Sequence, residues 1–141
     1  MNSITLVKKA TEKSLFLKFI NLGDTDSWGR PLSLERKENW PDYYSEVWKD
    51  IVLNENKVDV VFIDGRFRVC CCVYSIIKIL ENNWKETIFM IHDFWNRKEY
   101  FVLLKFLDEI ESKSRLGVFA IKKDINIHEI NSILPQYSSM Y

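Results

Sequence analysis

The feature that most constrains the fold is a short, almost wholly apolar run at residues 58–63 (VDVVFI), which stops at Asp64 and Gly65. A strand that is apolar on both faces must be covered on both faces, as in a parallel sheet. Residues 66–81 follow with an apolar pattern, free of Gly and Pro, that is long enough for a crossover helix. A buried strand followed by such a helix indicates an α/β fold.

The rest of the chain continues this alternation of strands and helices. The pattern predicts further strands at residues 15–22, 87–91 and 116–121, and further helices at 42–53, 97–112 and 124–134, the last stopped by Pro135. Residues 23–41 are rich in polar and turn-forming side chains and are expected to form a long loop. We therefore predict a single domain over residues 1–141, a Rossmann-like three-layer sandwich with a mostly parallel sheet.

Composition narrows the class of protein. The 141 residues suffice for one domain with a core, and 20 basic against 20 acidic residues give a net charge of zero. No overall field therefore gathers nucleic acid or an anionic membrane, and no stretch approaches the roughly 20 apolar residues of a membrane span. Cys70, Cys71 and Cys72 are contiguous, so they cannot supply a disulfide framework. We expect a cytoplasmic protein that binds neither nucleic acid nor membrane, with these thiols acting as small buried hydrophobes.

Two polar clusters directly follow the strands expected at 58–63 and 87–91. The first contains Asp64, Arg66 and Arg68, and the second contains His92, Asp93 and Arg97. Ligands of open parallel sheets bind beyond the carboxyl ends of the strands, so both clusters are expected to line one cleft. Carboxylates accept protons or hold hard cations, arginine binds carboxylate or phosphate, and histidine titrates near neutral pH.

Each of these residues also has a purely structural interpretation. Asp64 before Gly65 would cap the next helix or complete a turn, and Asp93 would cap the one after it. An ion pair of Asp64 with Arg97, or of Asp93 with Arg66, would join neighbouring loops without any ligand. His92 equally suits a buried histidine with satisfied polar atoms, and Arg68 suits a solvated position. The sequence leaves these alternatives open.

The segments VDVVFIDGRFRVCCC, TIFMIHDFWNRKEY and RLGVFAIKK resemble the carboxyl-terminal half of class I S-adenosylmethionine-dependent methyltransferases. They are similar above all to a branch with an FIDGRFRVAC-type segment followed by an HDF-x-x-R-x-x-Y segment, and the likeness covers residues 23–122. The resemblance implies that Asp64, His92 and Asp93 line the reaction cleft. It also implies contacts to an anionic substrate by Trp28, Arg66, Arg68 and Arg97. In some related O-methyltransferases the acids at these strand ends hold a divalent metal, which implies Asp64 and Asp93 as its ligands.

The chain departs from this family at the cofactor site. Such methyltransferases hold S-adenosylmethionine with a glycine-rich turn after the first strand and an acid after the second, and neither motif occurs here. The match implies that residues 15–22 are the family's third strand and that Asp24 stands for the acid beside adenine. The family's first strand would pair with 58–63. We therefore expect that edge to pair with a second copy, with a separate partner or with residues 15–22.

Three functions are compatible with these features. The first is a methyltransferase-like enzyme that O-methylates a sugar or another small metabolite, with Asp64 or His92 as the base. The second is a non-catalytic interaction module with a methyltransferase fold. The third is a nucleotide- or phosphosugar-binding transferase that uses Arg66, Arg68 and Arg97.

Overall fold

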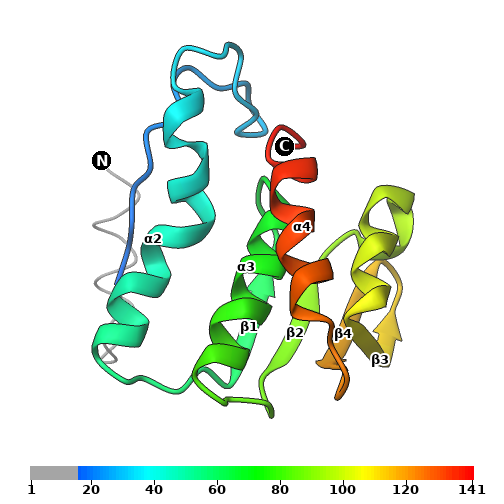
Figure 1. Ribbon diagram of the computed structural model, residues 1–141. Helices are drawn as coiled ribbons and strands as arrows, with labels where there is room; N and C mark the ends of the chain where they lie inside the picture. The colour runs from blue at the N-terminus through cyan, green and yellow to red at the C-terminus, as the bar shows by residue number, and fades with distance from the viewer. Residues whose placement is uncertain (1–15) are drawn as a thin grey trace, which may run out of the picture.

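The computed structural model describes residues 16–141 (Figure 1). Its α-helices are α2 (Trp40–Leu53), α3 (Arg68–Glu81) and α4 (Ile127–Tyr137), and its short 3₁₀ helices are η1 (Lys37–Asn39), η2 (Phe94–Asn96) and η3 (Lys98–Lys105). Its strands are β1 (Val60–Ile63), β2 (Ile88–Ile91), β3 (Leu107–Lys113) and β4 (Leu116–Ile121). Within this part of the chain, every helix is too short or too polar to cross a membrane.

The four strands form one mixed sheet in the order β1-β2-β4-β3. β1 and β2 are parallel, with Val60 opposite Ile88 and Ile63 opposite Ile91. β4 runs antiparallel to both of its neighbours, β2 and β3. The α/β class is confirmed, but the prediction of a mostly parallel sheet is wrong. The reason is the tight connection between β3 and β4, which forces two consecutive strands to be antiparallel.

The helix predicted over residues 97–112 is wrong beyond Lys105, because η3 ends there and β3 follows. Tyr100 and Leu103 are buried in η3, and their spacing of three residues suits a 3₁₀ helix as well as an α-helix. In β3 only Leu107 is buried, and the charged residues after it lie on the exposed edge of the sheet. Charged residues are common on edge strands, and in β3 their spacing along the sequence is the same as that expected for the polar face of a helix.

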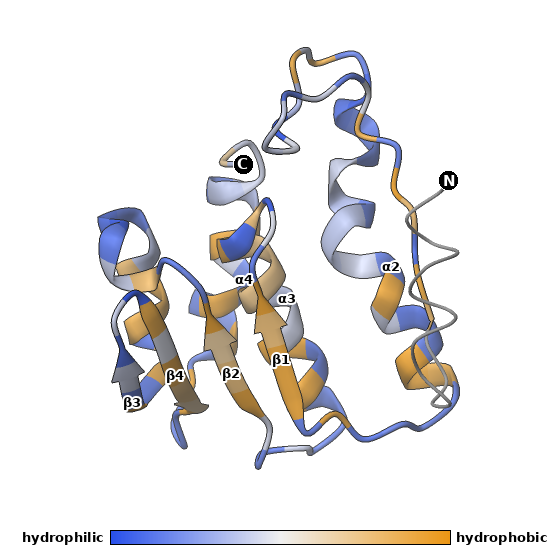
Figure 2. Cartoon of the chain, turned by 180° about the vertical axis from the view of Figure 1, so that it is seen from behind, coloured by the Kyte–Doolittle hydropathy of each residue, from blue (hydrophilic) through white to orange (hydrophobic). Residues whose placement is uncertain are grey.

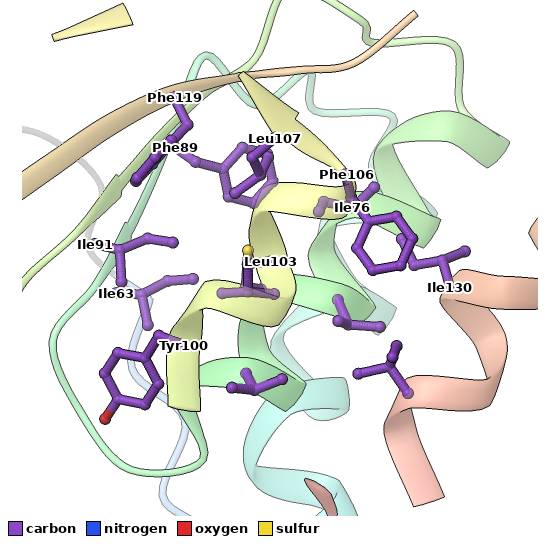
Figure 3. Packing of buried hydrophobic residues seen from close by; sticks show 14 of the residues in the cluster. Ile63, Ile76, Phe89, Ile91, Tyr100, Leu103, Phe106, Leu107, Phe119 and Ile130 are labelled. Atoms are coloured by element: carbon purple, nitrogen blue, oxygen red, sulfur yellow. The ribbon is translucent and has the colours of Figure 1, made fainter. Parts of the chain in front are cut away.

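The core lies between the sheet and the helices α3, α4 and η3. Figure 3 shows sheet residues facing helix residues across it, namely Ile63, Phe89, Ile91 and Phe119 against Ile76, Leu103 and Ile130. The other face of the sheet has no described helix in front of it in Figure 2, and Phe62 on that face is 59% exposed. The described residues therefore form two layers, and the predicted third layer is not among them.

Residues 16–22 lie beside α2 and do not form the strand predicted over 15–22, whose first residue lies outside the described part (Figure 1). Lys18 forms an ion pair with Asp50 of α2, and Leu22 is buried with Trp40 and Tyr44. The apolar residues of this segment thus cover the aromatic side of α2 instead of extending the sheet. Among the described residues, β1 is consequently an edge strand.

The remaining predicted helices are confirmed with shifted ends. Those expected at 42–53 and 66–81 begin at Trp40 and Arg68. Asn126 caps α4, since its side chain accepts hydrogen bonds from two backbone N–H groups of the first turn. The predicted stop at Pro135 is wrong, because α4 continues to Tyr137. Pro135 lies inside α4, so the helix lacks the backbone hydrogen bond from this position to the carbonyl of Asn131 but does not end there.

Candidate functional site

A cleft of about 890 Å³ lies beyond the carboxyl ends of β1 and β2, at the edge of the sheet where β4 begins. The loops after β1 and β2, the residue before β4, and nine residues between positions 19 and 30 line it: Phe19, Ile20, Asn21, Leu22, Gly23, Thr25, Trp28, Gly29 and Arg30. The structure brings most of the predicted site residues together there: Trp28, Asp64, Arg66, Arg68, His92, Asp93 and Arg97. Asp24, predicted as a cofactor contact, is not part of the lining.

The loop after β1 has an unusual backbone that positions the start of α3. Phe67 adopts a left-handed conformation with φ of 50°, which an L residue rarely adopts outside turns. Its ring packs on Trp40 and Tyr43, with centroids 5.5 and 5.4 Å away, and these contacts hold the turn. A side chain at position 65 would displace Tyr43, because a Cβ atom there would lie 2.4 Å from the hydroxyl of Tyr43.

Arg68 is a buried link between the two loops of the cleft. Its side chain is only 5% exposed. Its Nε donates to the carbonyl of Gly65 at 2.9 Å, and its Nη1 donates to the carbonyl of His92. The guanidinium also lies 3.4 Å from Asp64 and 3.7 Å from Asp93. Arg68 thus makes the ion pairs that join the loops and is not solvated. The pairs predicted between Asp64 and Arg97 and between Asp93 and Arg66 are not found among the described residues.

Asp64 and His92 form a pair at the floor of the cleft. The Nδ1 of His92 lies 3.0 Å from Oδ1 of Asp64 and 3.6 Å from Oδ1 of Asp93. The direction of the ring does not make either contact a hydrogen bond, so the pair is held by charge whenever the imidazole is protonated. Asp64 is 45% exposed, whereas Asp93 is 17% exposed and lies 3.2 Å from Arg115. Asp64 is therefore the carboxylate that a ligand reaches.

A divalent metal does not fit between Asp64 and Asp93. The guanidinium of Arg68 already occupies the space near both carboxylates, and its fixed positive charge would repel a second cation. Within residues 16–141, no group of three or more His, Cys, Asp or Glu side chains is arranged to hold a metal ion.

Two lining arginines were not anticipated from the sequence. Arg115 precedes β4, and a parallel β4 would have placed it at the opposite edge of the sheet. Arg30 closes a turn in which the carboxylate of Asp26 accepts hydrogen bonds from the N–H groups of Trp28 and Arg30, at 2.8 and 2.9 Å. The bond from Arg30 is the main cause of the lowered pKa of Asp26. An Asp four residues before an Arg, with Gly between them, was the available signal for this turn.

No family model matches the sequence, and no curated protein matches it. The crystal structure of a methyltransferase-like protein from Silicibacter pomeroyi is similar to this chain, with a TM-score of 0.66 and 24% sequence identity. The match covers 85% of this chain and 59% of that protein, so this chain spans about three fifths of its length. The fold is therefore methyltransferase-like.

S-adenosylmethionine does not fit the described lining of the cleft. Its methyl group is carried by a positively charged sulfonium. Five arginines and only two aspartates line the cleft, so the excess positive charge of the lining repels this group. Both aspartates also lie against Arg68, so the guanidinium already offsets part of their negative charge. The charges of this lining suit an anionic ligand better than they suit this cofactor.

Proposed function

We propose that the cleft is the acceptor site of a methyltransferase-like enzyme and that it binds a small metabolite through a hydroxyl group. The observation that carries this proposal is the 3.0 Å approach of Asp64 and His92 at the ends of adjacent parallel strands. Neither side chain is fully buried, so both are open to a ligand in the cleft. A carboxylate beside an imidazole is a common arrangement for removing a proton from a hydroxyl.

In this proposal each residue of the site has a separate task. His92 accepts the proton of the bound hydroxyl, and the negative charge of Asp64 stabilises the imidazolium that results. Arg68 acts through Asp64 by fixing the position of its carboxylate. Arg68 is thus a positioning residue, while Asp64 and His92 touch the acceptor.

O-methylation with S-adenosylmethionine as the donor is the finer form of this proposal. The methyltransferase-like solved structure and the resemblance of the sequence support it. The described residues of the cleft supply only the acceptor side. The direct test of the donor is isothermal titration of the purified chain with S-adenosylmethionine and S-adenosylhomocysteine. Saturable one-to-one binding would support this finer form, and no binding would refute it.

The acceptor role is tested by a methyl-transfer assay with a panel of sugars, sugar phosphates and hydroxy acids. His92→Asn and Asp64→Asn should each lower the transfer rate by about 10²- to 10⁴-fold, the usual contribution of a general base. His128→Asn, on the exposed start of α4, is the matched control and should not change the rate. A rate that both cleft variants leave unchanged would remove the pair from the mechanism.

The edge of β1 that no described strand covers supports a second candidate, an interaction module. Ile88 donates to the carbonyl of Asp59 and His92 donates to that of Ile63, so the alternation of a parallel ladder leaves the backbone groups of Val60 and Phe62 facing outward. An apolar groove of about 450 Å³ separates this edge from α2 and residues 16–20. We propose that a strand of a second copy or of another protein pairs there. Chains that associate but bind no donor would favour this candidate over the enzyme.

We further propose that the protein works in the cytoplasm, where thiols stay reduced. Cys70, Cys71 and Cys72 are all free thiols on α3, and Cys70 and Cys72 are buried. Burial raises the pKa of Cys72 well above its ordinary value, so its thiol stays protonated. Such cysteines serve packing and need no oxidising compartment.

A further inference from the structure

We propose that the ligand of the cleft carries a phosphate group and that Arg66 and Arg97 bind it, flanked by Arg30 and Arg115. This inference rests on the proposed function, because it names the class of metabolite whose hydroxyl faces Asp64 and His92. The ligand is then a phosphorylated, hydroxyl-bearing small molecule such as a phosphosugar.

The first argument is the kind of cation that lines the cleft. The chain has six arginines and 14 lysines, and five of the arginines line this cleft. None of the lysines that the structure describes is part of the lining. A lysine would serve equally well to make a surface positive, whereas the planar fork of arginine matches the oxygens of a phosphate. The selective use of arginine thus points to recognition of a phosphate or a carboxylate.

The second argument is the charge that remains after the internal ion pairs are counted. Arg68 is committed to Asp64 and Asp93, and Arg115 also contacts Asp93. Within the described part of the chain, no carboxylate lies within 4.0 Å of Arg30 or Arg66, and the contact of Arg97 with Glu99 is 3.9 Å long. Three guanidinium groups therefore line one cleft with only partial compensation, because the carboxylate of Asp26 interacts with Arg30 and Arg66 and that of Glu99 lies near Arg97. The three groups repel one another.

This excess of charge favours a phosphate over a carboxylate. A phosphate monoester carries a charge of about −1.5 to −2 near pH 7 and has three acceptor oxygens, so it can satisfy several guanidinium groups at once. A carboxylate carries a single charge and two oxygens, which one arginine satisfies.

The third argument is that Arg97 is held in place before any ligand arrives. The ring of Tyr100 lies at the end of the core and is 8% exposed (Figure 3). The guanidinium of Arg68 lies 5.8 Å from the centre of this ring, and that of Arg97 lies 6.0 Å from it. Cations favour such positions over an aromatic ring. The backbone N–H of Arg66 donates to the hydroxyl of Tyr43 at 3.2 Å, which fixes the start of its side chain. The buried ring of Tyr100 therefore holds the guanidinium of Arg97, and the half-buried Tyr43 holds the backbone of Arg66.

The test is isothermal titration with four probes at low salt: inorganic phosphate, glucose 6-phosphate, glucuronate and glucose. Phosphate and glucose 6-phosphate should bind the folded chain, and glucuronate and glucose should bind much more weakly. Arg66→Gln and Arg97→Gln should each lower the affinity for glucose 6-phosphate about tenfold or more, since each removes hydrogen bonds to a charged group. Arg66→Lys keeps the charge and loses the fork, and it should fall between Arg66→Gln and the original chain.

Lys123→Gln is the matched control, because it also removes one positive charge. Lys123 is exposed and follows the end of β4, at the edge of the sheet opposite the cleft. Its affinity for glucose 6-phosphate should stay within about twofold of the original, as expected for a charge beyond the reach of screened interactions.

Three results would overturn the inference: no binding of phosphate or glucose 6-phosphate, equal binding of glucuronate, or an equal loss in Lys123→Gln and Arg66→Gln. The outcome is separable from that of the proposed function. Transfer to neutral sugars by a chain that binds no phosphate would refute the phosphate site and keep the acceptor role. Binding of glucose 6-phosphate without transfer to any acceptor would keep the phosphate site and refute the enzyme.

Discussion

Replacing Arg68 with methionine should lower the free energy of unfolding by about 3 kcal/mol. Removing one partner of a buried ion pair typically costs about 3–5 kcal/mol, because the remaining charge stays buried without compensation. Asp93 is 17% exposed and fits this case, whereas Asp64 is 45% exposed and keeps part of its hydration. The lower end of the range therefore applies. Methionine preserves most of the packing of the arginine stem, so the loss comes from the charge and the donors.

The assay is urea unfolding followed by tryptophan fluorescence, which the five tryptophans of the chain make sensitive. Arg115→Met is the matched control. Arg115 also contacts Asp93, at 3.2 Å, but its side chain is 55% exposed, and exposed ion pairs contribute about 1 kcal/mol or less. In thermal unfolding the Arg68 variant should melt about 6–12 °C lower, at about 2–4 °C for each kcal/mol.

Equal urea midpoints for the two variants would refute this reasoning. They would mean that burial of the guanidinium of Arg68 does not set its contribution to stability. A loss confined to the Arg68 variant would instead confirm that the two loops of the cleft are joined through this side chain.

Other parts of the fold give four further predictions. Gly117→Ala should cost about 1–3 kcal/mol in urea unfolding, because its Cβ atom would lie 2.4 Å from the ring of Phe119. Burial raises the pKa of Cys70 from 9.0 to about 11, so a thiol reagent at pH 8 should modify it about a hundredfold more slowly in the folded chain than in urea. Because the pKa of Cys70 is higher in the folded chain than in the unfolded chain, the folded state holds this proton more tightly. Its contribution to stability is complete below pH 9 and is lost as the pH rises to 11, so the urea midpoint should fall over that range. Phe62→Pro removes a backbone N–H of β1 that points outward and is not bonded to β2. If a second copy pairs with this edge, the chain should self-associate at high concentration in sedimentation velocity, and the variant should not. Self-association that the proline leaves unchanged would show that the edge of β1 is not the interface.

Local pattern was sufficient for the elements that carry the site. β1 and β2 are short apolar runs that end at a turn, and α3 is a long apolar pattern without Gly or Pro, so periodicity and length identified all three. Placing Asp64 and His92 in one cleft then required only that the two strands be parallel neighbours, as they are.

Pairing between distant segments was beyond the reach of the sequence. Residues 16–22 have the composition of a strand, yet their apolar side chains contact α2, and only tertiary packing decides between these outcomes. The charged residues on the exposed edge of β3 have a spacing that predicts a helix, and the pairing with β4 makes this segment a strand instead. Arg68 is buried directly after the left-handed turn at Phe67. Phenylalanine does not favour a left-handed backbone, so the sequence does not predict this turn.

The prediction of a mostly parallel sheet was wrong about the direction of β4, and this direction affects the charge of the cleft. A strand that runs antiparallel to β2 begins where β2 ends, so the residue before β4 lies at the ligand-binding edge. Arg115 is that residue, and its ion pair with Asp93 offsets a carboxylate that would otherwise repel a phosphate. In an all-parallel sheet the same arginine would lie at the far edge, and the cleft would have one cation fewer beside an unshielded carboxylate. The antiparallel hairpin is therefore part of what makes this end of the sheet suitable for an anion.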